Sequence, residues 1–216
     1  TKINCFGKTD TGLVRKNNED TFIVKPDMGF CLVADGMGGA AAGELASRIF
    51  AETALKVFLE AKGRSETGNK EQDQTTNNDV TIIRYETKIL KQDQTTADSS
   101  DDATIIRYET EIQKQVQATF IIANEKILDH VKETPHHEGM GCTAELIAFS
   151  EDDFVLGHVG DSRTYRIRNG QLEQLTKDHS LVQEQIDQGL ISPEEARNHS
   201  LRKVISRAVG VEERVV

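Results

Sequence analysis

The stretch Val33-Ala34-Asp35-Gly36-Met37-Gly38-Gly39 decides how this chain is interpreted. Before it, residues 30–34 form a short apolar run, which predicts a buried strand. After it, apolar residues recur at helical spacing over residues 40–59, which predicts a helix. The glycines between them permit backbone angles closed to other residues and let a ligand approach the main chain. Asp35 is therefore either an ordinary acidic residue favoured by the helix dipole or a rigidly presented ligand-binding carboxylate.

Composition narrows the class of protein. The chain has 216 residues, of which 37% are hydrophobic, and a formal net charge of −10. This charge argues against a nucleic-acid partner or an anionic membrane surface. No apolar run approaches the ~18 residues of a membrane span, and residues 1–20 lack the pattern of a signal peptide. The three widely spaced cysteines match no zinc site and indicate reduced thiols, so we expect a cytoplasmic protein.

A charged loop precedes the next predicted strand, residues 21–25. Arg15 and the pair Glu19-Asp20 flank this loop. Such a run is most often simply solvated. However, a guanidinium group binds phosphate oxygens in a bidentate manner, and neighbouring carboxylates attract cations. The alternative interpretation is therefore a site for a phosphate and a metal ion.

A polar duplication interrupts the middle of the chain. Residues 72–76 (QDQTT) recur as residues 92–96, and residues 81–87 (TIIRYET) recur as residues 104–110. Two copies are too few for a solenoid, so we expect a duplicated insertion at about 63–101 within one domain. The second copy continues into a helical apolar pattern. This pattern predicts a long helix over about 102–133, with Asp101 or Asp102 as its N-cap.

The C-terminal half predicts strands followed by polar helices. Residues 143–150 and 154–159 are apolar runs, and the second leads into Gly160-Asp161, again an acidic residue after a strand. Asn169-Gly170 joins two further strands, residues 164–168 and 171–175, as a hairpin turn. Ser192-Pro193-Glu194-Glu195 is a strong helix start within the polar segment that follows.

Several of these stretches, taken together and in order, resemble the bacterial type-2C (PPM) metal-dependent protein Ser/Thr phosphatases. The matching stretches are residues 15–20 (RKNNED), 33–44 (VADGMGGAAAGE), 139–143 (GMGCT), 157–163 (GHVGDSR) and 175–180 (LTKDHS). The resemblance implies an α+β fold, a four-layer α-β-β-α sandwich of two antiparallel sheets flanked by helices. It also implies a single phosphatase-type domain over residues 1–216.

The resemblance also implies an activity and a set of site residues. The activity is hydrolysis of phosphoserine and phosphothreonine in proteins by a metal-activated water. Asp35 would bridge two Mg²⁺ or Mn²⁺ ions, and the carbonyl of Gly36 would bind one of them. Glu19 and Asp20 would act mainly through metal-bound waters. The Arg15 side chain would hold the substrate phosphate, so Arg15 and Asp35 are the expected catalytic residues.

Further implications concern the surroundings of the site. Asp161 matches a ligand of a third metal ion, and the segment after Lys177 matches a flap beside the site. Met37 stands where some eukaryotic members carry a histidine, so a metal-bound water or another group must protonate the leaving alcohol. The implied partner is a phosphoprotein produced by a bacterial Ser/Thr kinase. A sporulation-type or stress-response phosphatase of the same superfamily fits the same motifs.

The sequence departs from the family pattern near its C-terminal end. The family's last strands carry a Ser-Asp-Gly motif and a later Asp-Asn pair, both of which complete the metal site. After Asp161 this chain has only two further aspartates, Asp178 and Asp187. We therefore expect a C-terminally incomplete domain, either a piece of an active phosphatase or a catalytically inactive phosphatase-like regulatory or phosphoprotein-binding module.

Overall fold

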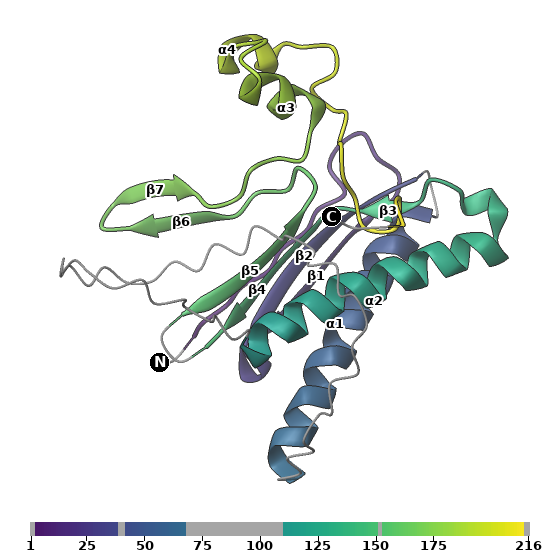
Figure 1. The fold of residues 1–216 in the computed structure, drawn as a ribbon, viewed down its shortest axis with the longest axis vertical. Coiled ribbons are helices and arrows are strands. Elements are labelled where there is room, and N and C mark those ends of the chain that lie inside the picture. Colours follow the sequence, from purple (N-terminus) through teal and green to yellow (C-terminus); the bar gives the residue numbers. More distant parts are fainter. Residues whose placement is uncertain (1–2, 39–41, 68–109, 151–152, 214–216) are drawn as a thin grey trace, which may run out of the picture.

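A five-stranded antiparallel sheet lies at the centre of the described part of the molecule (Figure 1). The structure is a computed structural model that describes residues 3–38, 42–67, 110–150 and 153–213. The strand order is β1-β2-β4-β5, and β3 pairs with the end of β2. These strands are β1 (Asp20–Lys25), β2 (Phe30–Met37), β3 (Gly141–Cys142), β4 (Ala144–Phe149) and β5 (Phe154–Val159).

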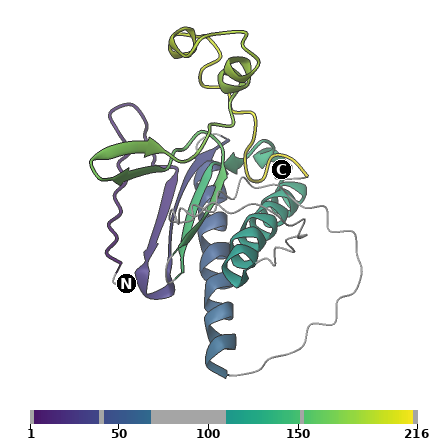
Figure 2. The same ribbon diagram turned by 60° about the vertical axis from the view of Figure 1, so that its left-hand side comes forward.

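Two long helices, α1 (Ala42–Thr67) and α2 (Glu111–Glu133), cover one face of this sheet (Figure 2). The core lies between the sheet and these helices. Phe30, Phe50 and Phe120 are fully buried there, and the rings of Phe50 and Phe120 meet edge to face at 4.9 Å. Burial of each such side chain contributes about 1.5–3 kcal/mol. None of the described helices is long and apolar enough to cross a bilayer.

The second sheet among the described residues is the hairpin of β6 (Tyr165–Arg168) and β7 (Gln171–Gln174). Asn169 and Gly170 both have positive φ angles, 52° and 75°, as the predicted Asn-Gly turn requires. Two antiparallel sheets with helices therefore confirm the predicted α+β class. Of the described helices, α1 and α2 form the helical layer.

The sheet face away from α1 and α2 is partly open. Val33 is 49% exposed on this face. A hollow of about 260 Å³ lies beside it and is mostly apolar. Its lining includes Phe6, Phe22, Val24, Cys31, Ile147 and Leu156. Neither Asp20 nor Asp35 lines this hollow, whereas Glu145 and Thr164 do.

Strand β2 is longer than predicted. The apolar run 30–34 predicts a strand that ends in Asp35, whereas β2 continues to Met37. The reason is a distant pairing, in which Gly36 and Met37 lie opposite Cys142 and Gly141 of β3. Asp35 is therefore held inside a strand, more rigidly than a residue at a strand end.

Helix α2 begins later than predicted, at Glu111 and not near residue 102. Thr110 is extended and caps the helix, since its hydroxyl accepts a hydrogen bond from the Gln113 amide while the Gln113 side chain accepts from the Thr110 amide. The predicted caps Asp101 and Asp102 lie outside the described residues, as does the first repeat copy. Residues 63–67, the beginning of the predicted insertion, belong to α1.

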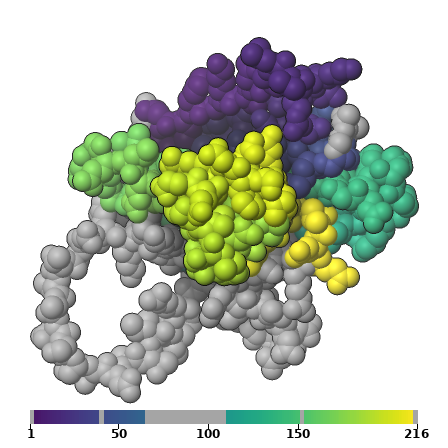
Figure 3. Space-filling view, turned by 90° about the horizontal axis from the view of Figure 1, so that it is seen from above, coloured from purple at the N-terminus to yellow at the C-terminus, as the bar shows by residue number. Residues whose placement is uncertain are grey.

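The segment after β7 carries α3 (Leu181–Asp187) and α4 (Pro193–Arg197). Both helices stand beyond one end of the main sheet (Figure 1). Seen from above, this yellow-green segment stands beside the purple N-terminal part of the chain (Figure 3). The predicted start of α4 is confirmed, because Ser192 forms a capping box with Glu195.

Candidate metal and phosphate site

Two carboxylates face each other at the end of the main sheet. Asp20 opens β1 and Asp35 lies near the end of β2, and the antiparallel register places them directly opposite each other. Asp20 lies close enough to Asp35 to raise the pKa of the Asp35 carboxyl group. Such a pair of like charges is unfavourable unless a proton or a cation lies between them.

The electrostatics of this pair favour a cation. Partial burial is the main cause that raises the pKa of Asp35 to about 6; the neighbouring charges of Asp20 and Asp161 act in the same direction, while Arg15 opposes them. A divalent ion bound between the carboxylates would remove this cost of ionising Asp35.

Arg15 and Glu19 form an ion pair beside the acidic residues. Arg15 Nη1 donates to Glu19 Oε2 at 3.1 Å, and the Arg15 side chain is 73% exposed while that of Glu19 is only 10% exposed. The predicted site residues thus lie together, but two of them are engaged with each other. The bond to Glu19 engages one of the five N–H donors of the guanidinium group, so the group can bind a phosphate with its other donors.

Thr9 and Asn18, which were not among the predicted site residues, hold Asp20 in place, although Asn18 lies in the matching stretch 15–20. The Thr9 hydroxyl donates to Asp20 Oδ2 at 3.2 Å, and the Asn18 side chain accepts a hydrogen bond from the Asp20 amide at 3.0 Å. Asn18 also donates to Thr9 at 2.8 Å. The polar loop before β1 therefore orients the carboxylate.

The first turn of α1 packs closely against the backbone that carries the site. The Ser47 hydroxyl donates to the Glu19 carbonyl at 2.7 Å, and the Gly36 amide donates to the same carbonyl at 3.2 Å. A Cβ atom placed on Gly36 would lie 2.1 Å from the carbonyl oxygen of Gly43. Only glycine fits at this crossing of strand and helix, which fixes the backbone next to Asp35.

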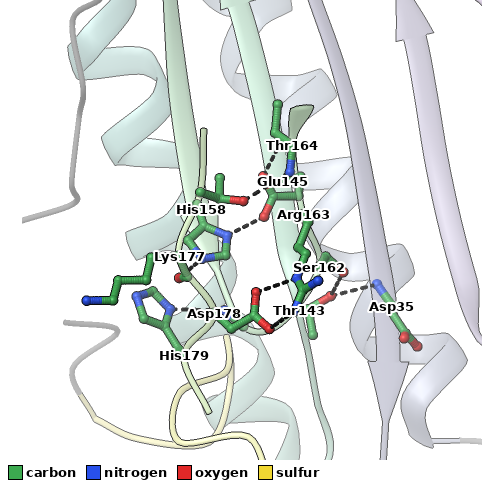
Figure 4. Close-up of polar contacts among 12 residues, drawn as sticks. Asp35, Thr143, Glu145, His158, Ser162, Arg163, Thr164, Lys177, Asp178 and His179 are labelled. Atoms are coloured by element: carbon green, nitrogen blue, oxygen red, sulfur yellow. Dashed lines mark hydrogen bonds and ion pairs between the residues drawn. The ribbon is translucent and has the colours of Figure 1, made fainter. Parts of the chain in front are cut away.

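A third acidic residue, Asp161, follows β5. It lies close enough to Asp35 to affect its pKa. A chain of hydrogen bonds joins the two strands: the Asp35 amide donates to Thr143 Oγ1 at 3.3 Å, and that hydroxyl bonds the Ser162 hydroxyl at 2.7 Å (Figure 4). The structure thus brings Arg15, Glu19, Asp20 and Asp35 together, with Gly36 next to Asp35 and Asp161 nearby.

The donors suit a hard divalent ion in kind. Carboxylate and carbonyl oxygens are the ligands that Mg²⁺ and Mn²⁺ prefer, and the Asp20–Asp35 pair offers two of them. Among the described residues, however, no three histidine, cysteine or acidic side chains converge closely enough to hold an ion. The described residues therefore provide part of a coordination shell.

Sequence reasoning missed a second polar cluster on the neighbouring strands. Glu145 of β4 and His158 of β5 lie directly opposite each other, and their side chains are bonded and almost fully buried. A usable signal was present: Glu145 is a charged residue inside the apolar run 143–150. A buried charge in such a position needs a partner.

The fold and the Asp20–Asp35 pair at the end of the main sheet together define the phosphatase 2C type of architecture. The chain belongs to the protein phosphatase 2C family, since the family model of that description matches residues 14–186.

The chain is similar to named members of this family. It is 32% identical over 207 residues to the serine/threonine protein phosphatase PstP of Mycobacterium tuberculosis, covering 96% of this chain and 31% of that protein. It is also 32% identical over 211 residues to a serine/threonine phosphatase of Listeria welshimeri, covering 96% of this chain and 67% of the relative. The chain thus spans about a third of the first relative and two thirds of the second.

Solved structures agree with this assignment. A crystal structure of the M. tuberculosis phosphatase PstP/Ppp matches with a TM-score of 0.67 at 30% identity, covering 95% of this chain and 67% of that one. A structure of the PstP catalytic domain in complex with two manganese ions matches with a TM-score of 0.63, also at 30% identity, covering 95% and 66%.

Proposed function

We propose that this protein is a metal-dependent phosphatase that hydrolyses phosphoserine and phosphothreonine in proteins. The observation that carries the proposal is the opposed Asp20–Asp35 pair with the exposed Arg15 guanidinium beside it. Carboxylates gather divalent cations, and arginine binds phosphate oxygens, so the edge offers both halves of a phosphate ester site. Membership of the protein phosphatase 2C family and the similarity to named Ser/Thr phosphatases support it.

Each residue has a separate task in this proposal. Asp35 and the Gly36 carbonyl would hold Mg²⁺ or Mn²⁺, and Glu19 and Asp20 would act mainly through metal-bound waters. Asp161 would bind a third ion. Bound ions supply an activated water and neutralise the phosphoryl oxygens. Arg15 binds the phosphate and orients it. Thr9, Asn18 and Thr143 keep the two aspartates in register.

We also propose the surrounding organisation. Residues 1–216 belong to a single phosphatase-type domain, and the polar duplication predicted at about 63–101 is, apart from residues 63–67 of α1, an insertion between α1 and α2. The substrate is a phosphoprotein made by a bacterial Ser/Thr kinase, and the reaction takes place in the cytoplasm. The similarity to bacterial Ser/Thr phosphatases and the three free cysteines support this setting.

One observation favours a second candidate, a catalytically inactive phosphatase-like module that binds phosphoproteins. Among the described residues no three candidate ligands converge on one point. Such a module would bind a phosphoserine peptide through Arg15 without releasing phosphate.

The two candidates are separated by one assay. Release of inorganic phosphate from a phosphoserine peptide is measured with Mn²⁺ and with a chelator, in the 216-residue chain and in any longer natural form. Chelator-sensitive release supports the enzyme. Tight peptide binding with no release in any form, and no dependence on metal, would instead support the module.

Arg15 gives a prediction specific to the phosphate. Replacing Arg15 with alanine removes a charge-assisted bidentate contact with the phosphate. We expect kcat/KM to fall roughly 10- to 150-fold, which corresponds to about 1.5–3 kcal/mol of lost transition-state stabilisation. Calorimetric Mn²⁺ affinity should change much less. Arg48→Ala is the matched control, because Arg48 forms comparable exposed ion pairs on α1. Equal kinetics in both variants would show that Arg15 does not bind the phosphate and belongs to a charged loop that is simply solvated.

A further inference from the structure

The segment after β7 is attached to the main sheet at a narrow root. We call residues 177–206 the flap; it carries α3 and α4 and stands beyond the end of the sheet (Figure 1). Ser180 and Ile205 form an isolated bridge where its two arms meet. The position of the flap therefore depends on the contacts of these few residues with β5, together with the bidentate bond from the Arg163 guanidinium group to the Asp178 carboxylate.

His179 joins both arms of the flap to the end of β5. Its amide donates to the Gly160 carbonyl at 2.7 Å, and its Nδ1 accepts from the Gly160 amide at 3.1 Å. The Ser206 amide on the returning arm donates to the His179 carbonyl at 2.8 Å. Gly160 directly precedes Asp161, so the root of the flap and the third acidic residue share one backbone segment.

His158 braces this junction from inside the sheet. Its Nε2 lies 2.8 Å from the Lys177 carbonyl, and because a carbonyl only accepts, Nε2 must carry a proton. Its Nδ1 is bonded to Glu145 Oε1, and Thr164 donates to the other oxygen of that carboxylate at 2.5 Å (Figure 4). The His158 and Glu145 side chains are only 9% and 6% exposed.

The neighbouring ring, that of His179, is held in its neutral form. His158 and His179 stack with centroids 4.7 Å apart. Although burial disfavours a charged His158 ring, the Glu145 carboxylate and the Lys177 carbonyl raise its pKa. Burial, with help from His158 and Arg207, lowers the pKa of His179 to about 4, which agrees with its Nδ1 accepting from Gly160. The His158 ring, with its proton on Nε2 and its Nδ1 bonded to Glu145, thus stacks on a neutral His179 ring that accepts from Gly160.

We propose that His158 is a positioning residue: held by Glu145, it fixes the root of the flap to the end of β5 and so sets how the flap meets a phosphoprotein. This inference rests on the proposed function for its kinetic consequence only. A peptide extends beyond its phosphate and reaches the flap, whereas a small aryl phosphate does not. His158 should therefore affect KM for a phosphopeptide more than turnover of an aryl phosphate.

The test uses variants that avoid leaving a buried charge unpaired. The double variant E145Q/H158A removes the brace, while the glutamine introduced in place of Glu145 can still accept from Thr164. E145Q/H158Q is the rescue variant, because the glutamine amide introduced in place of His158 can donate to the Lys177 carbonyl in place of Nε2–H. R166Q is the matched control, since it breaks the Arg166–Glu173 ion pair of the β6–β7 hairpin, away from the root.

Hydrogen exchange gives the direct readout. In E145Q/H158A we expect the amides of His179 and Ser206 to exchange about tenfold faster or more, while core β4 amides such as Leu146 keep their rates. E145Q/H158Q should restore part of the protection, and R166Q should resemble the unmodified protein. Unchanged root amides, or equal acceleration in root and core, would overturn the proposal, because the pair would then be irrelevant or merely structural.

Kinetics give the second readout. We expect KM for a phosphoserine peptide to rise about tenfold in E145Q/H158A, with kcat for para-nitrophenyl phosphate within about twofold. Equal losses on both substrates would contradict a positioning role. If the unmodified protein hydrolyses neither substrate, the proposed function fails, and hydrogen exchange still decides whether His158 anchors the flap.

Discussion

Replacing Asp35 with asparagine is expected to abolish metal binding at the acidic edge and, with it, phosphate release. The substitution keeps the size of the side chain but removes the negative charge that lies opposite Asp20 on the neighbouring strand. Loss of an outer-shell partner alone typically costs 10–100-fold in metal affinity, so loss of a central ligand should cost about 100-fold or more. Calorimetry with Mn²⁺ measures this directly and does not depend on activity.

Asp35 also makes the stability of the metal-free protein depend on pH. The pKa of Asp35 is raised to about 6 in the folded state, above its ordinary value of 3.8. The folded state therefore binds more protons between these values, and this group's contribution to stability falls as pH rises from about 4 to 6. Asp35→Asn should lack that loss, and Mn²⁺ should stabilise the unmodified protein most above pH 6.

Asp129→Asn is the control, because Asp129 is an exposed carboxylate paired with Lys132 on α2. It should preserve the Mn²⁺-induced rise in Tm, and its pH profile should follow that of the unmodified protein. A full Mn²⁺ response in Asp35→Asn would show that Asp35 is not a ligand.

Local sequence signals predicted the elements that local chemistry determines. Strand β5 begins and ends where the apolar run 154–159 predicted. Asn169-Gly170 predicted the hairpin because both positions must adopt positive φ. Ser192 and Glu195 predicted the start of α4 because each side chain accepts a hydrogen bond from the other residue's backbone amide.

Features that depend on distant contacts were not predictable in the same way. The extension of β2 to Met37 depends on β3, about a hundred residues later, which pairs with Gly36 and Met37. The start of α2 illustrates a local error: aspartates at 101 and 102 were preferred as caps, but Thr110 with Gln113 forms the reciprocal capping box.

The candidate site shows the same division. The motifs placed Asp35 at a strand edge and Arg15 and Glu19 beside it, but they did not reveal that Arg15 and Glu19 form an ion pair. The Glu145–His158 pair depends on the register of β4 against β5. No local pattern fixes that register, although the charge inside an apolar strand indicated that some partner must exist.

Replacing Gly36 with alanine is expected to destabilise the whole fold, because the new methyl group has no room. Its Cβ would lie 2.1 Å from the Gly43 carbonyl oxygen and 2.7 Å from that of Glu19. Both obstacles are backbone atoms, of α1 and of the residue before β1, and neither can rotate away as a side chain would. Overpacking typically costs 1–3 kcal/mol, and with rigid neighbours we expect about 3 kcal/mol.

Thermal unfolding of the metal-free protein measures this effect without any assumption about catalysis. A loss of about 3 kcal/mol corresponds to a fall in Tm of roughly 6–12 °C for a chain of this size. Gly63→Ala is the matched control, since Gly63 lies in α1 with open space where the methyl group would go. There alanine should stabilise the helix by about 0.8–1 kcal/mol. Equal Tm values for the two variants would mean that α1 does not pack against β2 at Gly36, and that the backbone beside Asp35 is not held as the structure describes.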